Sequence, residues 1–232
     1  MMTQTLFSQV QGLFERTYSV VGMNLESCLI GPERCHALSR LAGPLADDLN
    51  PAARTFLRRS GSDLHLAIYY SPGLIERLER EDPRQVLSDT NIQALIMFVE
   101  ELNHALHAAL CFLRGEAQVD DEAFARNLEL QGQIDTYLLL LFFTAGLRGC
   151  RRVPPEDRAW LKDRLFAAQS SENYATEELR ERYRETRHWA ARYADYLDTM
   201  EGLARLAEVR AFHHLDYTGK LRRVREVCGD SA

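Results

Sequence analysis

The chain lacks the sequence features that define several large classes of protein. Its five cysteines are odd in number and include no Cys-x-x-Cys pair, which favours reduced thiols over a disulfide framework or a thiolate zinc site. It has no P-loop, no Gly-x-Gly-x-x-Gly turn and no Gly-x-Ser-x-Gly elbow, so the usual phosphate and oxyanion cradles are missing. The His-Glu-x-x-His signature of zinc peptidases is also absent.

Signals for export, for a membrane and for nucleic acid are missing as well. The longest apolar run, Tyr137 to Leu147, is about half of what a membrane span needs, so we expect none. The first residues lack the basic start, apolar block and cleavage pattern of a signal peptide, and we expect a cytoplasmic protein. With 28 basic and 34 acidic residues well mixed, the net charge of −6 predicts no binding to nucleic acid.

The composition is that of an ordinary globular protein with a substantial core. The chain has 232 residues, of which 46% are hydrophobic. We expect a single, mainly α-helical domain over residues 1–232. Residues 1–86 should hold the N-terminal helices and a small β-hairpin, and residues 87–232 the core of a helical bundle.

Turn residues and apolar periodicity predict the individual elements. In the N-terminal third we expect helices at about Thr5 to Tyr18 and Pro32 to Leu41, and a hairpin from Arg54–Arg58 and Leu64–Tyr70 around Ser60 to Asp63. Ser71 and Pro72 predict the start of a short helix that ends near Arg80. The later helices should span about Ser88 or Asp89 to Leu113, Asp120 or Asp121 to Leu147, Glu156 to Ala168, Asn173 to Met200, Leu203 to His214, and Gly219 to Val227.

The most informative segment, Val99 to Ala108, places two acids and two histidines inside an apolar helix. No Lys or Arg occurs from Ile92 to Leu113, and apolar residues occupy both sides of the predicted helix. Protein should therefore cover both sides. Buried acids and imidazoles are costly unless they are paired, hydrogen-bonded or metal-bound, so this segment predicts a polar site.

Glu101 and His104 of this segment are three positions apart, a spacing that puts both side chains on one face of a helix. A carboxylate oxygen and a neutral imidazole nitrogen suit iron, manganese or zinc. The same Glu-x-x-His pattern recurs at Glu185 and His188 on a later helix. His107, one turn beyond His104, either extends a ligand set or is a core residue.

Two Glu-x-x-His motifs on separate helices resemble the ferritin-like superfamily of di-iron and di-manganese carboxylate proteins. The small Ala105 after the first histidine is similar to the Glu-x-x-His-Ala segments of rubrerythrin-like members. The resemblance covers about Ile92 to Met200. It implies a helical-bundle fold, Glu101, His104, Glu185 and His188 as ligands of iron or manganese, and chemistry on dioxygen or a peroxide.

The family also uses acids from two further helices. On the helix between the motifs, Gln131 and Asp135 interrupt an apolar stripe at about the level of Glu101, so Asp135 is the expected third-helix ligand. Glu129 projects away from that stripe and should be solvated. Another ligand could come from Glu15, Glu76 or Glu79, and the sequence singles out none of them. If His188 faces solvent, at most a single-metal site around Glu101, His104 and Asp135 remains.

Two functions follow as hypotheses. The first is an iron- or manganese-dependent oxidoreductase of ferritin-like type, a di-iron oxidase, oxygenase or peroxidase acting on a small-molecule substrate with dioxygen or peroxide, and with a mononuclear or dinuclear site. The alternative is a non-enzymatic helical interaction or scaffold protein, in which the central polar residues form a structural network and bind no metal. The sequence leaves open whether the protein is a monomer or a homodimer.

Overall fold

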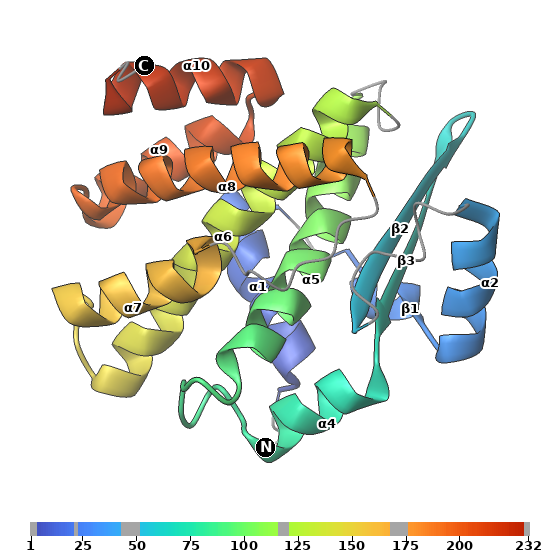
Figure 1. Cartoon of the computed structure of the whole chain (residues 1–232), viewed down its shortest axis with the longest axis horizontal. Helices are drawn as coiled ribbons and strands as arrows, with labels where there is room; N and C mark the ends of the chain where they lie inside the picture. Colours follow the sequence, from blue (N-terminus) through green and yellow to red (C-terminus); the bar gives the residue numbers. More distant parts are fainter. Residues whose placement is uncertain (1–3, 21–22, 43–51, 116–120, 168–175, 230–232) are drawn as a thin grey trace.

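Nine α-helices and a three-stranded sheet form the residues described by the computed structural model, which are 4–20, 23–42, 52–115, 121–167 and 176–229 (Figure 1). The mainly α-helical class with a small hairpin is confirmed. In chain order the elements are α1 (Leu6–Tyr18), β1 (Leu29–Ile30), α2 (Pro32–Ala42), β2 (Ala53–Ser60), β3 (Asp63–Tyr70), α4 (Pro72–Arg80), α5 (Ile92–Leu113), α6 (Glu122–Arg148), α7 (Pro155–Phe166), α8 (Glu177–Asp198), α9 (Gly202–His213) and α10 (Tyr217–Cys228).

Side-chain caps fix where several helices begin. Ser71 accepts a hydrogen bond from the Leu74 nitrogen and Asp121 one from the Phe124 nitrogen, as predicted for α4 and α6. The expected cap of α5 at Ser88 or Asp89 is wrong, because the helix starts at Ile92. The residue before it, Asn91, instead holds the preceding loop through bonds to the Glu81 and Val86 carbonyls. The start of the helix expected at Asn173 lies outside the described residues.

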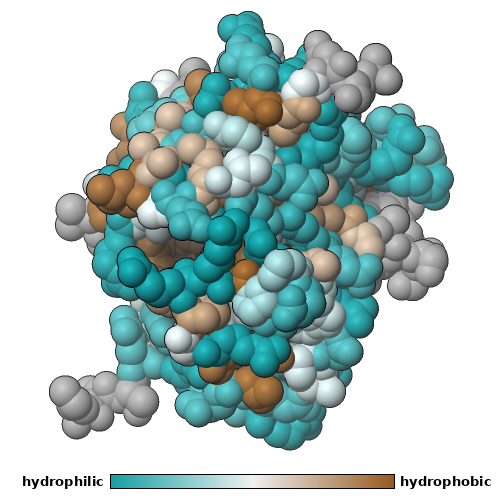
Figure 2. All heavy atoms as spheres, turned by 90° about the vertical axis from the view of Figure 1, so that its left-hand side faces the viewer, coloured by the Kyte–Doolittle hydropathy of each residue, from teal (hydrophilic) through white to brown (hydrophobic). Residues whose placement is uncertain are grey.

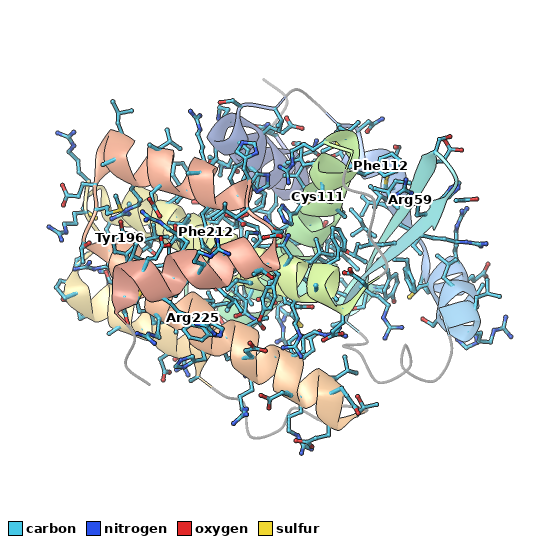
Figure 3. The ribbon with its side chains drawn as sticks, turned by 90° about the horizontal axis from the view of Figure 1, so that it is seen from above. Arg59, Cys111, Phe112, Tyr196, Phe212 and Arg225 are labelled. Atoms are coloured by element: carbon cyan, nitrogen blue, oxygen red, sulfur yellow. The ribbon has the colours of Figure 1, made fainter. Side chains whose placement is uncertain are left out.

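The hairpin packs its sheet against α5. Strands β2 and β3 pair antiparallel from Ala53 opposite Tyr70 to Ser60 opposite Asp63, and the two-residue β1, which the sequence did not predict, pairs parallel with β3. Thr55 of β2 donates to the Glu101 carbonyl at 2.8 Å. At the far end of the hairpin, the Arg59 guanidinium lies 5.7 Å from the ring centroid of Phe112 (Figure 3). The sheet therefore covers one side of α5.

On its other sides α5 contacts α6, α1, α4 and α7, so it is the central helix of the molecule (Figure 1). This enclosure explains why no basic residue occurs along it: an unpaired Lys or Arg would have no route to water. Among the described helices, α5 alone is long and apolar enough to cross a membrane by length and composition, and 72% of that stretch is buried. A buried core helix meets the same criteria, so the match gives only weak support for a membrane span.

Helix α6 packs between α5 and the C-terminal helices. It contacts α5 along one side and α8 along another, and α7 and α10 also lie against it. In Figure 1, α8, α9 and α10 run across the view while α5 runs steeply down it, so these long helices are not all aligned with one another. The hydrophobic core is continuous across them, with fully buried residues that include Val10, Leu102, Leu140, Tyr193 and Val224.

Candidate functional site

His104 lies at the contact between α5 and α6 with a carboxylate beside each of its ring nitrogens. Its Nδ1 atom is 3.8 Å from Oε2 of Glu101, and its Nε2 atom is 3.7 Å from Oε2 of Glu129. The side chains of His104, Glu101 and Glu129 are only 14%, 19% and 16% exposed. Both distances exceed hydrogen-bond length, and Nε2 is buried without a hydrogen-bond partner.

Gly132 provides the space that the imidazole occupies. A Cβ atom at this position would stand 2.9 Å from Nε2 of His104, closer than any normal contact. Glu129 and Gly132 are three residues apart on α6, so both lie on the face of α6 that contacts α5. A glycine inside an otherwise apolar helix lowers helix stability, and here the close approach of His104 accounts for it.

Glu100 adds a third acid to this group, which we call the histidine–carboxylate cluster: Glu100, Glu101, His104 and Glu129. Glu100 precedes His104 by one helical turn. Burial raises the pKa of Glu100 to about 8, and the nearby charge of Glu129 adds to the rise. Tyr183 of α8 borders the cluster, and burial, together with Glu129, raises the pKa of its phenol.

The cluster favours a proton on its imidazole. Burial alone would lower the pKa of His104, but Glu129 and Glu101 outweigh it and raise the pKa to about 9. Burial also raises the pKa of Glu129. For Glu101 the opposite holds, because interactions with His104 and Thr55 outweigh burial and bring its pKa below the usual value. In the metal-free protein at neutral pH, His104 is therefore a cation facing Glu101.

Asp135 belongs to a separate buried network. Its carboxylate accepts hydrogen bonds from the Tyr18 hydroxyl and, at 2.6 Å, from the side-chain amide of Asn103, while Gln131 donates to the Tyr18 oxygen. Burial raises the pKa of Asp135 to about 6 despite these donors. Asp135 thus lies level with the middle of α5, as predicted, but its oxygens are engaged with Tyr18 and Asn103.

Two further histidines extend this second network through ring contacts. His107 and His213 lie 4.6 Å apart between ring centroids, and Tyr18 stacks on His213 at 3.9 Å. Burial lowers the pKa of both imidazoles, with the charge of buried Lys220 adding to the effect. His107 is therefore a buried residue of the core with a neutral imidazole, and a part for it in a ligand set stays a prediction.

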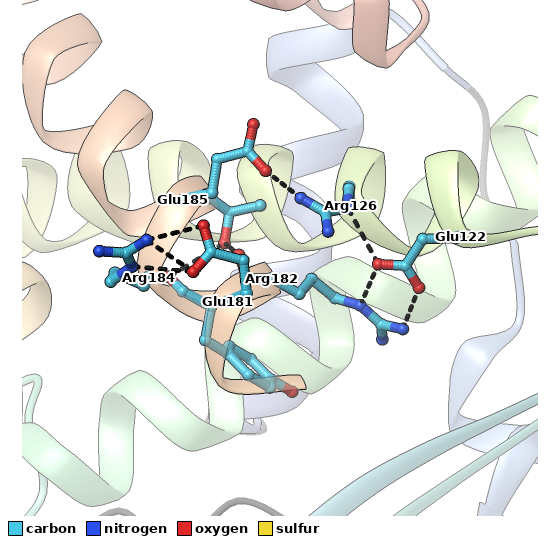
Figure 4. A network of polar contacts seen from close by, with 8 residues as sticks. Glu122, Arg126, Glu181, Arg182, Arg184 and Glu185 are labelled. Atoms are coloured by element: carbon cyan, nitrogen blue, oxygen red, sulfur yellow. Dashed lines mark hydrogen bonds and ion pairs between the residues drawn. The ribbon is translucent and has the colours of Figure 1, made fainter. Parts of the chain in front are cut away.

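The second Glu-x-x-His motif is placed elsewhere. Glu185 forms an ion pair with Arg126 of α6, next to the pairs of Glu122 with Arg126 and Arg182 (Figure 4). His188 is exposed and contacts the ring of Trp189. Neither side chain joins His104, because the face of α8 that carries His188 points to solvent. The side-chain positions therefore do not form the dinuclear set that the two motifs predict.

The prediction that Glu129 is solvated was wrong. The three candidates for a further ligand, Glu15, Glu76 and Glu79, lie away from the cluster. Glu129 is mostly buried because α6 is covered on more than one side, so a residue off its main apolar stripe can still face protein. Glu76 and Glu79 are exposed on α4. Glu15 accepts a hydrogen bond from the Met23 nitrogen near the end of α1.

The described residues contain no three His, Cys, Asp or Glu side chains already placed to hold a metal ion together. The histidine–carboxylate cluster brings two carboxylates within 4 Å of one imidazole. No protein-family model, curated protein or solved structure matches this chain.

Proposed function

We propose that this protein binds one divalent transition-metal ion, iron or manganese, through Glu100 and His104 of α5 and Glu129 of α6. The observation that carries the proposal is the position of His104, whose buried Nε2 atom has no hydrogen-bond partner and faces a carboxylate at 3.7 Å. An imidazole nitrogen and two carboxylates are donors that suit these ions.

Each residue of the cluster has a distinct role in this proposal. Nε2 of His104 is the ligand atom, since it is buried without a hydrogen-bond partner and faces Glu129. Glu101 lies behind the ring at Nδ1 and orients it, as carboxylates behind metal-bound histidines commonly do. Glu100 completes the set by turning its side chain toward Nε2, one helical turn away.

The charges of the cluster favour the exchange of its protons for a metal ion. The metal-free cluster at neutral pH holds protons on His104 and Glu100, whose pKa values are about 9 and about 8. A divalent ion that displaces both protons brings in two charges as two leave. The net charge of the buried group is then unchanged, which avoids a large electrostatic cost.

The resemblance to the ferritin-like superfamily supports the proposal through Glu101 and His104 only. Because Glu185 pairs with Arg126 and His188 is exposed, we propose a mononuclear site and do not retain Asp135, Glu185 or His188 as ligands. Three protein ligands leave coordination positions open to water, dioxygen or a peroxide. Oxidoreductase activity and membership of the superfamily stay predictions.

The test compares the two Glu-x-x-His motifs directly. Protein produced with added manganese and iron is analysed for bound metal, and metal-free protein is titrated with Mn²⁺ by calorimetry in two buffers of different ionisation enthalpy. We expect about one ion per chain and release of about two protons per ion near pH 7. H104Q should abolish binding, whereas H188Q, the same change in the exposed motif, should leave it intact.

The competing function is the structural one, a scaffold protein whose cluster only fixes the packing of α5 on α6. It is favoured by the absence, among the described side chains, of a ready ligand set, and by the ion pairs available to a protonated His104. It predicts no stoichiometric metal and identical Mn²⁺ titrations for H104Q and H188Q. Either result would remove the metal-binding proposal.

A further inference from the structure

A cavity of about 930 Å³ opens on the face formed by α1, the C-terminal half of α6, the segment before α7, and α9. Figure 2 shows this side of the molecule, with a hollow whose interior is brown and whose rim is teal. Its volume lies at the upper end of the range for sites that bind small molecules. The cavity does not include the histidine–carboxylate cluster.

The wall of the cavity is mainly apolar. Side chains from α1, α6 and α9 line it: Leu13, Phe14, Leu138, Phe142, Leu206 and Val209. Phe142 is 54% exposed although it sits in the most apolar part of α6. A large aromatic side chain exposed beside a concave apolar wall is typical of a surface that is covered when a ligand binds.

Arginines supply the charge of the cavity. Arg151 is exposed and makes no hydrogen bond or ion pair with the described residues. Arg158 is only 17% exposed; its Nη1 atom is 3.7 Å from Asp198, and its Nε atom is buried without a hydrogen-bond partner. Arg205 donates to the neutral carbonyl of Met200. Of these three cations, Arg151 and Arg205 have no ion pair with a described carboxylate, and Arg158 has one, with Asp198.

The acids that line the same cavity already contact donors or cations, although Oδ1 of Asp198 is buried without a hydrogen-bond partner. Asp198 accepts from the Tyr137 hydroxyl at 2.8 Å and from Lys162 at 2.6 Å. Glu201 pairs with Arg152 at the rim, and Asp135 belongs to the network with Tyr18. Apart from Oδ1 of Asp198, the free hydrogen-bonding capacity described in the cavity is that of guanidinium groups, which bind carboxylates through two parallel bonds.

We propose that this cavity binds an amphipathic carboxylate of the fatty-acid class, with its chain along the apolar wall and its head group on Arg158 and Arg151. The shape supplies an apolar wall, and Arg151, which has no ion pair with a described residue, supplies an unmatched positive charge. A neutral ligand would leave the Arg151 guanidinium without a charged partner, and a cationic one would be repelled. The proposal is independent of metal binding.

The test measures binding of decanoate by calorimetry, beside 1-decanol, decylamine and decyl phosphate. We expect decanoate to bind at least tenfold more tightly than decanol or decylamine. R158Q and R151Q should each weaken decanoate binding several-fold. R148Q is the matched control, because Arg148 is exposed, pairs with Asp157 and lies outside the cavity. Filling the wall with V209W should weaken decanoate and decanol alike.

Arg158 also contacts Asp198, so R158Q could unfold the protein; R151Q keeps the test decisive because Arg151 has no described polar contact to lose. Equal affinity of R151Q and R148Q for decanoate would overturn the proposal. Decanol binding as tightly as decanoate would also overturn it, since the head group would then contribute nothing. Tighter binding of decyl phosphate would reassign the site to a phosphate amphiphile.

Discussion

Among single residues, Gly132 offers the sharpest probe of the site, because one methyl group there would press on Nε2 of His104 at 2.9 Å. We expect G132A to lose about 1 to 3 kcal/mol of unfolding free energy through overpacking, and to bind Mn²⁺ at least tenfold more weakly. Denaturant unfolding and calorimetry measure the two effects.

Gly146 of the same helix is the matched control for this substitution. It is exposed, and nothing lies within 4 Å of where its Cβ would stand. G146A should therefore be neutral or gain up to about 1 kcal/mol from the better helix propensity of alanine. If G132A stabilised the protein as much as G146A, the close packing of His104 on α6 would be disproved.

The contrast between Glu129 and Asp135 shows what the sequence could predict of single residues. The apolar segment around Glu101 and His104 correctly indicated a buried polar site. Asp135, the partner predicted on α6, bonds to Tyr18 and Asn103 instead of approaching His104. Its apolar stripe is not the only covered face, because α6 is packed against α5 and α8 on different sides. Gly132 was the signal that could have found Glu129, since an isolated glycine in an apolar helix indicates a close approach.

At the scale of elements, the cap of α6 holds the helix that carries Glu129 and Gly132. The Asp121 carboxylate accepts a 2.6 Å hydrogen bond from the Phe124 nitrogen. We expect D121A to lose about 1 kcal/mol of stability, with a range of roughly 0.5 to 2, measured by urea unfolding.

The D121N variant separates the hydrogen bond from the charge. Asparagine caps helices about as well as aspartate, so D121N should keep most of the stability that D121A loses. The loss in D121A then reports the cap. A D121N variant as unstable as D121A would show that the charge at the start of α6, and not the hydrogen bond, is what stabilises the helix.

Elements with a local sequence signal were predictable, and those defined by distant partners were not. Ser71 with Pro72 and Asp121 mark helix starts through contacts within one turn, so the sequence around them is sufficient. Strand β1 is two residues long and exists only because it pairs with β3, some forty residues later. Asp89, expected at the start of α5, instead pairs with Arg164 of α7.

At the scale of the whole molecule, contacts between residues far apart in the sequence define the two buried networks. Tyr18 reaches Asp135 across 117 positions of sequence, and Arg210 reaches the Thr17 carbonyl across 193. Apolar periodicity shows which face of a helix is buried, but it does not show which other helix covers that face. The enclosure of α5 was therefore predictable, while the division of its polar residues between two networks required the structure.

The pH dependence of global stability is the property that these networks impose on the whole molecule. Glu100 and His104 have folded-state pKa values of about 8 and about 9, above their ordinary values of 4.5 and 6.5. The folded protein therefore binds more protons than the unfolded chain, and stability falls as pH rises through these values. His107 and His213, whose pKa values are lowered, act in the opposite direction, but only below about pH 6.5.

The interval from pH 7 to pH 9 consequently isolates the cluster. We expect the metal-free protein to lose on the order of 2 kcal/mol of unfolding free energy across it, measured by urea titration with a chelator present. E100Q should remove the part of the loss that falls below about pH 8, and adding H104Q should flatten the remainder. The exposed-motif variant H188Q should keep the full slope. A wild-type stability that rises between pH 7 and pH 9 would contradict the protonated state assigned to the cluster, and with it the exchange of protons for a metal ion.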